Sequence, residues 1–202
     1  CIIDEYIEMD KLKKLVPDVP TIKTIQKEAV LINQEISHGT ICLAILLESL
    51  KKCAVIDKVS VEHFSVSENG NPRTYAALLN ALRYCINKRF NIISMSIGVF
   101  GRICAQDIHP IVNKLQDTLI VAAASNICRI TYPASMPTVL GVKSATDPLA
   151  PRFSVVDAPP DGIELVANIP DTSVMKAIHE RYDVTCSGSN SILVPQVSAE
   201  II

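Results

Sequence analysis

The sequence of 202 residues is 49% hydrophobic and 20% charged, the balance of a single globular domain that buries its own core. Its net charge of -2 argues against a nucleic-acid-binding or anionic-membrane-binding surface, and 4% aromatic residues without Trp argue against a stacking platform for bases. The longest apolar runs, such as residues 118–124, fall far short of the roughly 20 residues of a membrane-spanning helix. The first residues lack the basic, apolar and small-residue order of a secretory signal.

Short apolar runs alternate along the chain with segments of helical periodicity. Strands are predicted at residues 1–3, 58–66, 92–96, 119–124, 138–145 and 163–167, with a loop at 69–72 and a Pro-rich loop around 148–160. Helices are predicted at residues 38–53, 75–87 and 105–115 and from Ser191 through Ile201. This alternation predicts an α/β fold: a three-layer, doubly wound, mostly parallel sheet with helices on both faces. No linker or repeat divides residues 1–202, so one domain is expected, with its functional side chains at the carboxyl ends of the strands.

The seven cysteines are odd in number and irregularly spaced, and they contain no CxxC pair. That pattern argues against a zinc cage and against a disulfide scaffold. Reduced thiols packed as small hydrophobic side chains are expected, and with them a cytoplasmic location.

Two polar residues stand where buried elements begin or end. Asp4 ends the first predicted strand after three apolar residues, and His38 opens a helix within Ser37-His38-Gly39-Thr40. An imidazole is the natural general base near neutral pH, and a glycine beside it allows another stretch of backbone to come close. The other histidines, at positions 63, 109 and 179, are expected to be structural or solvated. Taken alone, an aspartate in this place is more often a turn or helix cap than a catalytic residue.

Two further residues have the chemistry of acyl transfer. Ser191 lies at the start of the predicted C-terminal helix, where free N–H groups and the helix dipole favour an oxyanion. Asn126 closes the strand at 119–124, where a fixed amide could donate to the same oxyanion. Each by itself is a common cap or turn residue.

In their order along the chain, Asp4, His38, Asn126 and Ser191 resemble the catalytic residues of the subtilisin-like serine proteases, the subtilases. Other segments are similar to that family in the same order. They are Ile2-Ile3-Asp4, Ser37-His38-Gly39-Thr40, Ile93 to Gly98, Ile120 to Asn126, Tyr132 to Ser135 with Pro137 and Val139, Phe153-Ser154, Glu164 to Ala167, and Ser191 four residues before Pro195. The resemblance extends from about residue 1 to 202.

The chain departs from the family pattern at several positions. The small residue and glycine that usually follow the aspartate are Glu5 and Tyr6, and the usual second histidine after the histidine motif is Ile41. The other departures are Ser125 before the asparagine, and Ser189 and Asn190 before the nucleophile. A calcium loop that many relatives have is missing, so no tight calcium site, no other metal and no cofactor are expected. The family's domain usually extends further at both ends, so the chain is interpreted as trimmed to its catalytic centre, to be completed by flanking segments or a partner.

The resemblance implies a serine endopeptidase. Ser191 would attack a peptide carbonyl while His38 takes its proton, Asp4 would orient the imidazole, and Asn126 with the Ser191 N–H would bind the oxyanion. An extended peptide would lie between residues 70–75 and 96–98. The expected substrate-binding residues are Gly70, Ser96, Ile97, Gly98, Ala124, Ser125 and Thr131. Bulk from Val99 and Ser125 predicts a restricted pocket for a small or medium side chain.

Two other classes of function compete with this interpretation. A subtilase fold whose altered glycines have abolished turnover would be a binding or regulatory module. A nucleotide-binding doubly wound domain shares the architecture, but the sequence contains neither GxGxxG nor a P-loop. The expected partner is a peptide or protein substrate, with limited processing of a specific peptide, such as the leader of a precursor, favoured over bulk digestion.

Overall fold

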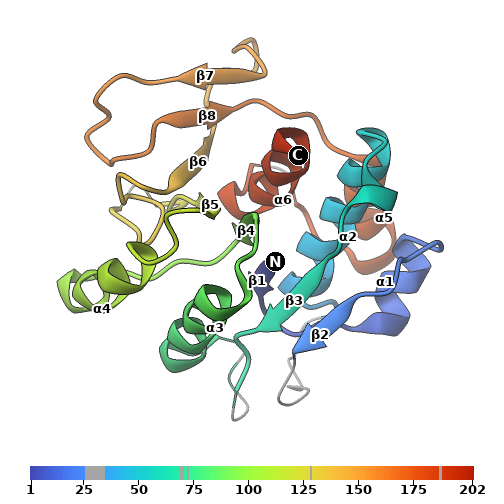
Figure 1. The fold of residues 1–202 in the computed structure, drawn as a ribbon. Coiled ribbons are helices and arrows are strands. Elements are labelled where there is room, and N and C mark those ends of the chain that lie inside the picture. Colours follow the sequence, from blue (N-terminus) through green and yellow to red (C-terminus); the bar gives the residue numbers. More distant parts are fainter. Residues whose placement is uncertain (26–34, 69–70, 72, 128, 187) are drawn as a thin grey trace.

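The computed structural model describes residues 1–25, 35–68, 71, 73–127, 129–186 and 188–202. Within these residues the chain forms an eight-stranded sheet of order β2-β3-β1-β4-β5-β6-β8-β7 (Figure 1). The strands are β1 (Ile2–Asp4), β2 (Lys23–Ile25), β3 (Glu62–Ser65), β4 (Ile92–Met95), β5 (Leu119–Ala123), β6 (Leu140–Ser144), β7 (Phe153–Val155) and β8 (Leu165–Ala167). All neighbouring pairs are parallel except β7 with β8, which is antiparallel.

Helices cover both faces of this sheet, as predicted (Figure 1). They are α1 (Met9–Leu15), α2 (His38–Lys52), α3 (Tyr75–Lys88), α4 (Arg102–Val112), α5 (Ser173–Tyr182) and α6 (Asn190–Ile201), with a short 3-10 helix at Ile56–Lys58. Helices α3 and α4 pack on one face, and α1, α2, α5 and α6 pack on the other. The expected three-layer, mostly parallel α/β architecture is therefore confirmed.

Successive residues of β1 show how the sheet divides the core. Ile2 packs with α1, α2 and α5, and Ile3 packs with α3 and α4, because side chains alternate across a strand. Both are fully buried. A strand covered on both faces has apolar side chains on both sides, which is why β5 and the first two residues of β1 form continuous apolar runs.

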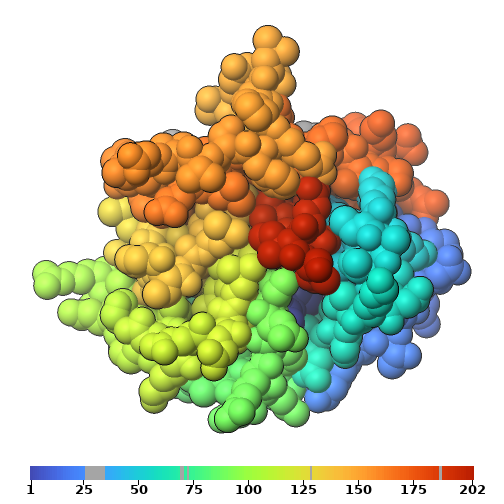
Figure 2. All heavy atoms as spheres, turned by 45° about the horizontal axis from the view of Figure 1, so that its top comes forward, coloured from blue at the N-terminus to red at the C-terminus, as the bar shows by residue number. Residues whose placement is uncertain are grey.

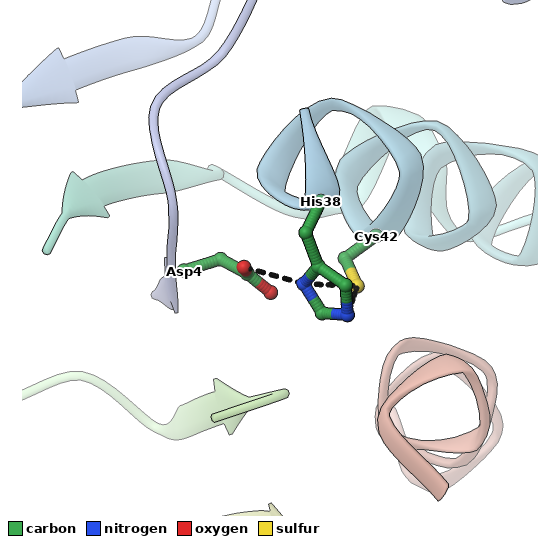
Figure 3. A group of neighbouring side chains, drawn as sticks. All are labelled: Asp4, His38 and Cys42. Carbon is green, nitrogen blue, oxygen red and sulfur yellow. Dashed lines mark hydrogen bonds and ion pairs between the residues drawn. The ribbon is translucent and has the colours of Figure 1, made fainter. Parts of the chain in front are cut away.

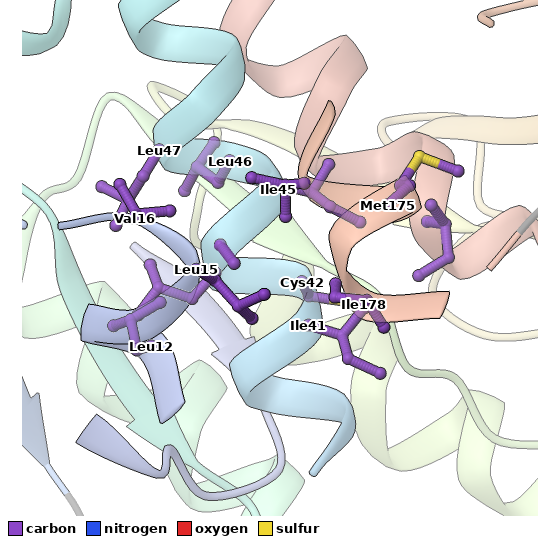
Figure 4. Close-up of a cluster of buried hydrophobic side chains, with 14 of the residues drawn as sticks. Leu12, Leu15, Val16, Ile41, Cys42, Ile45, Leu46, Leu47, Met175 and Ile178 are labelled. Atoms are coloured by element: carbon purple, nitrogen blue, oxygen red, sulfur yellow. The ribbon is translucent and has the colours of Figure 1, made fainter. Parts of the chain in front are cut away.

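Helix α2 is the centre of the larger layer. It is buried along most of its length, with α1 and α5 against it (Figure 4) and α6 beside it. Leu12, Leu15, Ile45 and Ile178 are among the side chains that fill the contact. Full burial of each such side chain stabilises the fold by about 1.5–3 kcal/mol. The helix that begins at His38 is therefore anchored firmly enough to position that residue.

The structure also contains elements that periodicity did not predict. These are α1, β2, α5 and β7, the last of which lies within the segment expected to be a Pro-rich loop. The strand expected at 58–66 is shorter, at Glu62–Ser65, and the helix expected at 105–115 begins at Arg102 and ends at Val112. No helix in the described part of the chain is long and apolar enough to span a bilayer.

Candidate active site

Three neighbouring strands bring the predicted site residues to one edge of the sheet. Strands β1, β4 and β5 are adjacent and parallel, so their carboxyl ends open on the same side. Asp4 ends β1, residues 96–98 follow β4, and residues 124–126 follow β5. Helices α2 and α6 begin at this edge, with His38 and Ser191 in their first turns. Segments far apart in sequence therefore meet in one place.

Asp4, His38 and Ser191 form a continuous chain of hydrogen-bond distances. Nδ1 of His38 lies 2.7 Å from Oδ1 of Asp4, and Nε2 of His38 lies 3.0 Å from Oγ of Ser191. An ionised carboxylate only accepts hydrogen bonds, so Nδ1 carries the proton toward Asp4. In the neutral imidazole Nε2 is then the acceptor for the Ser191 hydroxyl, which is the arrangement a general base requires.

The charges of Asp4 and His38 shift the pKa values of both groups. Burial raises the pKa of Asp4, but the His38 charge and the hydrogen bonds from His38 and the Glu5 N–H outweigh it, so that the pKa lies below its usual value. Burial lowers the pKa of His38, yet the Asp4 carboxylate outweighs it and the pKa stands well above 6.5. Asp4 is therefore ionised at neutral pH, and it stabilises the protonated form of His38.

The first turn of α2 is fixed by three local contacts. Ser37 is the N-cap, and its Oγ accepts a hydrogen bond from the Thr40 N–H. The carboxylate of Glu5 accepts a hydrogen bond of 3.1 Å from the His38 backbone N–H. Gly39 packs so tightly that an added Cβ would lie 2.2 Å from the Glu5 carbonyl oxygen. The expectation that Gly39 permits a close backbone approach is confirmed.

The thiol of Cys42 lies one helical turn beyond His38 and faces the same imidazole (Figure 3). Its Sγ is 3.6 Å from Nδ1 and 3.9 Å from Nε2 of His38. Burial, followed by the Asp4 charge, raises the pKa of Cys42, so the thiol is neutral. Ligand atoms of Asp4, His38 and Cys42 lie within 4.8 Å of one another, and in the described residues this is the group that could hold a metal ion.

Asn126 and the start of α6 form the other half of the site. Oδ1 of Asn126 accepts a hydrogen bond of 2.9 Å from the Asn190 N–H, which fixes the amide. Nδ2 of Asn126 donates at 3.4 Å to Oγ of Ser189, and that oxygen lies 2.8 Å from Oγ of Ser191. The Asn190 side chain turns away, donating to the carbonyls of Ala124 and Ser125. The Asn126 amide is thus directed at the side of Ser191.

A cavity of about 370 Å³ opens beside His38 and Ser191. The predicted substrate-binding residues found in its lining are Ser96, Ile97, Gly98, Ala124, Ser125 and Thr131, together with Asn126. Gly70 lies outside the described residues. Val99 was expected to narrow the pocket, but it pairs with Tyr132 in a β-bridge, packs against the α3–α4 cluster and is not part of the lining.

Five further residues complete the lining of this cavity: Arg73, Phe100, Ala123, Ile127 and Ser189. Phe100, Ile127 and Ser189 were not predicted to belong to the site, whereas Arg73 falls within the segment 70–75 expected to flank the substrate. Arg73 forms an ion pair of 2.7 Å with Glu5, a contact that sequence spacing does not reveal. Phe100 and Ile127 are exposed apolar side chains, and this combination could have indicated a contact surface.

Other candidate features lie away from the site. His63 is buried in β3, where Nε2 donates to the Glu5 carbonyl, and burial lowers its pKa to about 4. His109 lies on α4 and His179 lies on α5, and both are exposed. This agrees with the expectation that they are structural or solvated. A larger cavity of about 640 Å³, lined by Cys1 and Ile202 among others, opens between the N-terminus and the C-terminal helix (Figure 2). It contains none of the Asp4, His38 or Ser191 groups.

Comparisons with known proteins agree with the fold. The sequence model of the Subtilase family matches residues 20–200, and the chain belongs to that family. A solved structure described as a lanthipeptide protease aligns with a TM-score of 0.61 and 14% identity, covering 98% of this chain and 70% of the other. The structure of the prenylagaramide maturation protease PagA aligns with a TM-score of 0.58 and 16% identity, covering 98% of this chain and 71% of the other. Among curated proteins none matches the sequence.

Proposed function

We propose that the chain is a serine endopeptidase in which Asp4, His38 and Ser191 form the catalytic triad. The observation that supports this most directly is the unbroken series from Oδ1 of Asp4 through both imidazole nitrogens to Oγ of Ser191, at 2.7 and 3.0 Å. Both distances fall within the range in which a nucleophile, a base and an orienting group act together. Membership of the subtilase family supports the same assignment.

In the proposed reaction Ser191 Oγ attacks a peptide carbonyl carbon, and its proton passes to Nε2 of His38. The oxyanion is bound by Nδ2 of Asn126 and the backbone N–H of Ser191 at the start of α6. The C–N bond then breaks, His38 returns the proton to the leaving amine, and an acyl ester remains on Ser191. Water, deprotonated by His38, hydrolyses that ester and restores the hydroxyl.

The cavity supports an extended peptide as substrate, with a small or medium side chain before the scissile bond. A Cβ added at Gly98 would lie 2.4 Å from Cγ2 of Thr131, so these two residues pack closely at the wall. Phe100 and Ile127 add exposed apolar surface, which favours apolar residues elsewhere in the peptide. We propose processing of a specific peptide, as the names of the lanthipeptide and prenylagaramide maturation proteases also suggest.

Labelling with a fluorophosphonate tests this function directly. The wild-type protein is expected to form a covalent adduct on Ser191 and to cleave peptides, and Ser191→Ala is expected to lose both. Ser154→Ala, in β7 at the far edge of the sheet, is the control and should label normally. A wild-type protein that neither labels nor cleaves would instead indicate a binding module with the subtilase fold.

A further inference from the structure

Ser189 has an unusual role at the start of α6. It is the N-cap residue, but its side chain makes no capping hydrogen bond. Ser37, Thr74 and Thr172, the N-caps of α2, α3 and α5, each accept a backbone N–H in the ordinary way. The Ser189 hydroxyl lies instead 2.8 Å from Oγ of Ser191 and accepts from Nδ2 of Asn126. Its contacts are the nucleophile and the oxyanion donor.

The direction of each proton in this group follows from the Asp4 carboxylate. In the neutral imidazole that acts as general base, His38 donates to Asp4 through Nδ1, so Nε2 accepts from Ser191. The single hydroxyl proton of Ser191 is then used, and its oxygen can only accept from Ser189. The oxygen of Ser189 accepts in turn from Asn126. Each hydrogen bond in this series is therefore donated in the same direction, from Asn126 toward Asp4.

We propose that Ser189 is a further catalytic residue, a third donor that stabilises the oxyanion beside Asn126 and the Ser191 N–H. The inference rests on the proposed function. When Ser191 Oγ bonds to the carbonyl carbon, negative charge develops on the oxygen attached to that same carbon. The Ser189 O–H, already between Ser191 and the Asn126 amide, turns to donate to this oxygen. A hydrogen bond to a charged oxygen is stronger than one to a neutral hydroxyl, so the contact favours the transition state.

The backbone of Ser189 allows a clean test. Its φ of -86° and ψ of 127° are ordinary extended values that alanine adopts without strain. Because its hydroxyl caps no backbone N–H, its removal should leave the folded state intact. Both Ser189→Ala and Ser189→Gly are therefore expected to unfold at the wild-type temperature. The glycine variant also reproduces the residue usual for the family.

The experiment compares wild type, Ser189→Ala and Ser189→Gly on one fluorogenic peptide, with inhibition by a matching peptide aldehyde. Loss of one charged hydrogen bond predicts a fall in kcat of about 10- to 100-fold in both variants, with KM unchanged. Binding of the aldehyde, which forms a tetrahedral adduct on Ser191, should weaken by a similar factor. Ser154→Ala is the control.

Wild-type kcat in both variants, or higher activity when the hydroxyl is removed, would overturn the proposal. A lower kcat in Ser189→Ala with full activity in Ser189→Gly would also overturn the proposal, because that result would reflect crowding by the alanine Cβ and not the loss of the hydroxyl. The proposed function is judged separately, by wild-type turnover and by labelling that depends on Ser191. If the wild-type protein passes those tests while the Ser189 variants keep full activity, the proposed function stands and the proposed role of Ser189 is wrong.

Discussion

Replacing Asp4 with Asn tests the electrostatic centre of the site, because it removes one charge and almost no volume. The Asp4 side chain is fully buried, and Oδ1 lies 2.7 Å from both the His38 ring and the Glu5 N–H. Loss of a charge-assisted hydrogen bond costs about 1.5–3 kcal/mol. The amide keeps its oxygen toward both donors, because an NH₂ in that place would face the Glu5 N–H, so the imidazole tautomer is retained. The lost charge therefore predicts a fall in kcat of about 10- to 100-fold.

The same substitution should move the pH profile in a defined direction. Catalysis needs neutral His38, so wild-type activity is lost as pH falls through a His38 pKa that stands well above 6.5. In Asp4→Asn the carboxylate no longer raises this pKa, whereas burial still lowers it. The low-pH limb of the kcat/KM profile should therefore shift to lower pH, although the rate itself is reduced.

The assay is kcat/KM on a fluorogenic peptide between pH 5 and 10, with labelling of Ser191 as an independent measure. Asp157→Asn, at an exposed position after β7, is the matched control and should leave both the rate and the limb unchanged. A variant within tenfold of the wild-type rate would refute the assigned role of Asp4. An acid limb that stays in place or moves to higher pH would refute the electrostatic explanation.

Three further predictions concern other parts of the site and its support. Asn126→Ala should lower kcat by about 10²–10³ with little change in KM, and an unchanged kcat would exclude it as an oxyanion donor. Glu48→Gln should lower the free energy of unfolding at pH 7 by about 2–3 kcal/mol, because Glu48, whose pKa is lowered to about 2, accepts from the first N–H groups of α5. Because the pKa of Glu48 is depressed, the difference in unfolding free energy between wild type and Glu48→Gln, measured by urea denaturation, should be complete above pH 4.5 and should disappear as pH falls toward 2. A difference that does not change with pH would contradict this explanation. Peptide-library profiling should favour small or medium residues before the cleaved bond, and a preference led by Phe or Tyr would overturn the restricted pocket.

Burial explains which elements could be predicted from sequence. Strand β5 and helix α2 are surrounded by apolar neighbours, so their own residues show the pattern. Helix α5 is different, because it is mostly polar and has only Val174, Met175 and Ile178 buried. Its first turn is held by Glu48, 125 residues earlier along the chain from Ser173. The stability of such a helix depends on a contact that is distant in sequence, so local hydrophobic periodicity does not predict the helix.

The same distinction separates the predicted site residues from the missed ones. Asp4, His38 and Ser191 lie at element ends within short motifs, so their order along the chain was informative. Arg73 falls within the segment expected to flank the substrate, but spacing does not reveal its ion pair with Glu5, 68 residues away in sequence. Ser189 looked like a substitution for a glycine, and its contacts depend on how α6 meets the end of β5. These roles arise from tertiary packing alone.

The chain replaces backbone freedom after Asp4 with side-chain contacts. Where the family usually has a small residue and a glycine, Glu5 and Tyr6 are both buried. The Glu5 carboxylate contacts the His38 N–H, the Tyr6 carbonyl accepts from the Ser37 hydroxyl, and the Tyr6 N–H donates to Ser67. The first two bonds join the end of β1 to the start of α2, and the third joins it to the segment that follows β3.

Because the backbone of this segment is pinned at three points, the relation of Asp4 to His38 does not depend on glycine at positions 5 and 6. Gly39 remains essential, since its missing Cβ lets α2 approach the Glu5 carbonyl. The consequence of Ser125, which lines the cavity, should therefore fall on substrate approach. Ser189 adds a contact to Oγ of Ser191 and leaves the distances from Asp4 to His38 and from His38 to Ser191 within hydrogen-bond range. Sequence divergence at these positions is compatible with intact chemistry and altered specificity.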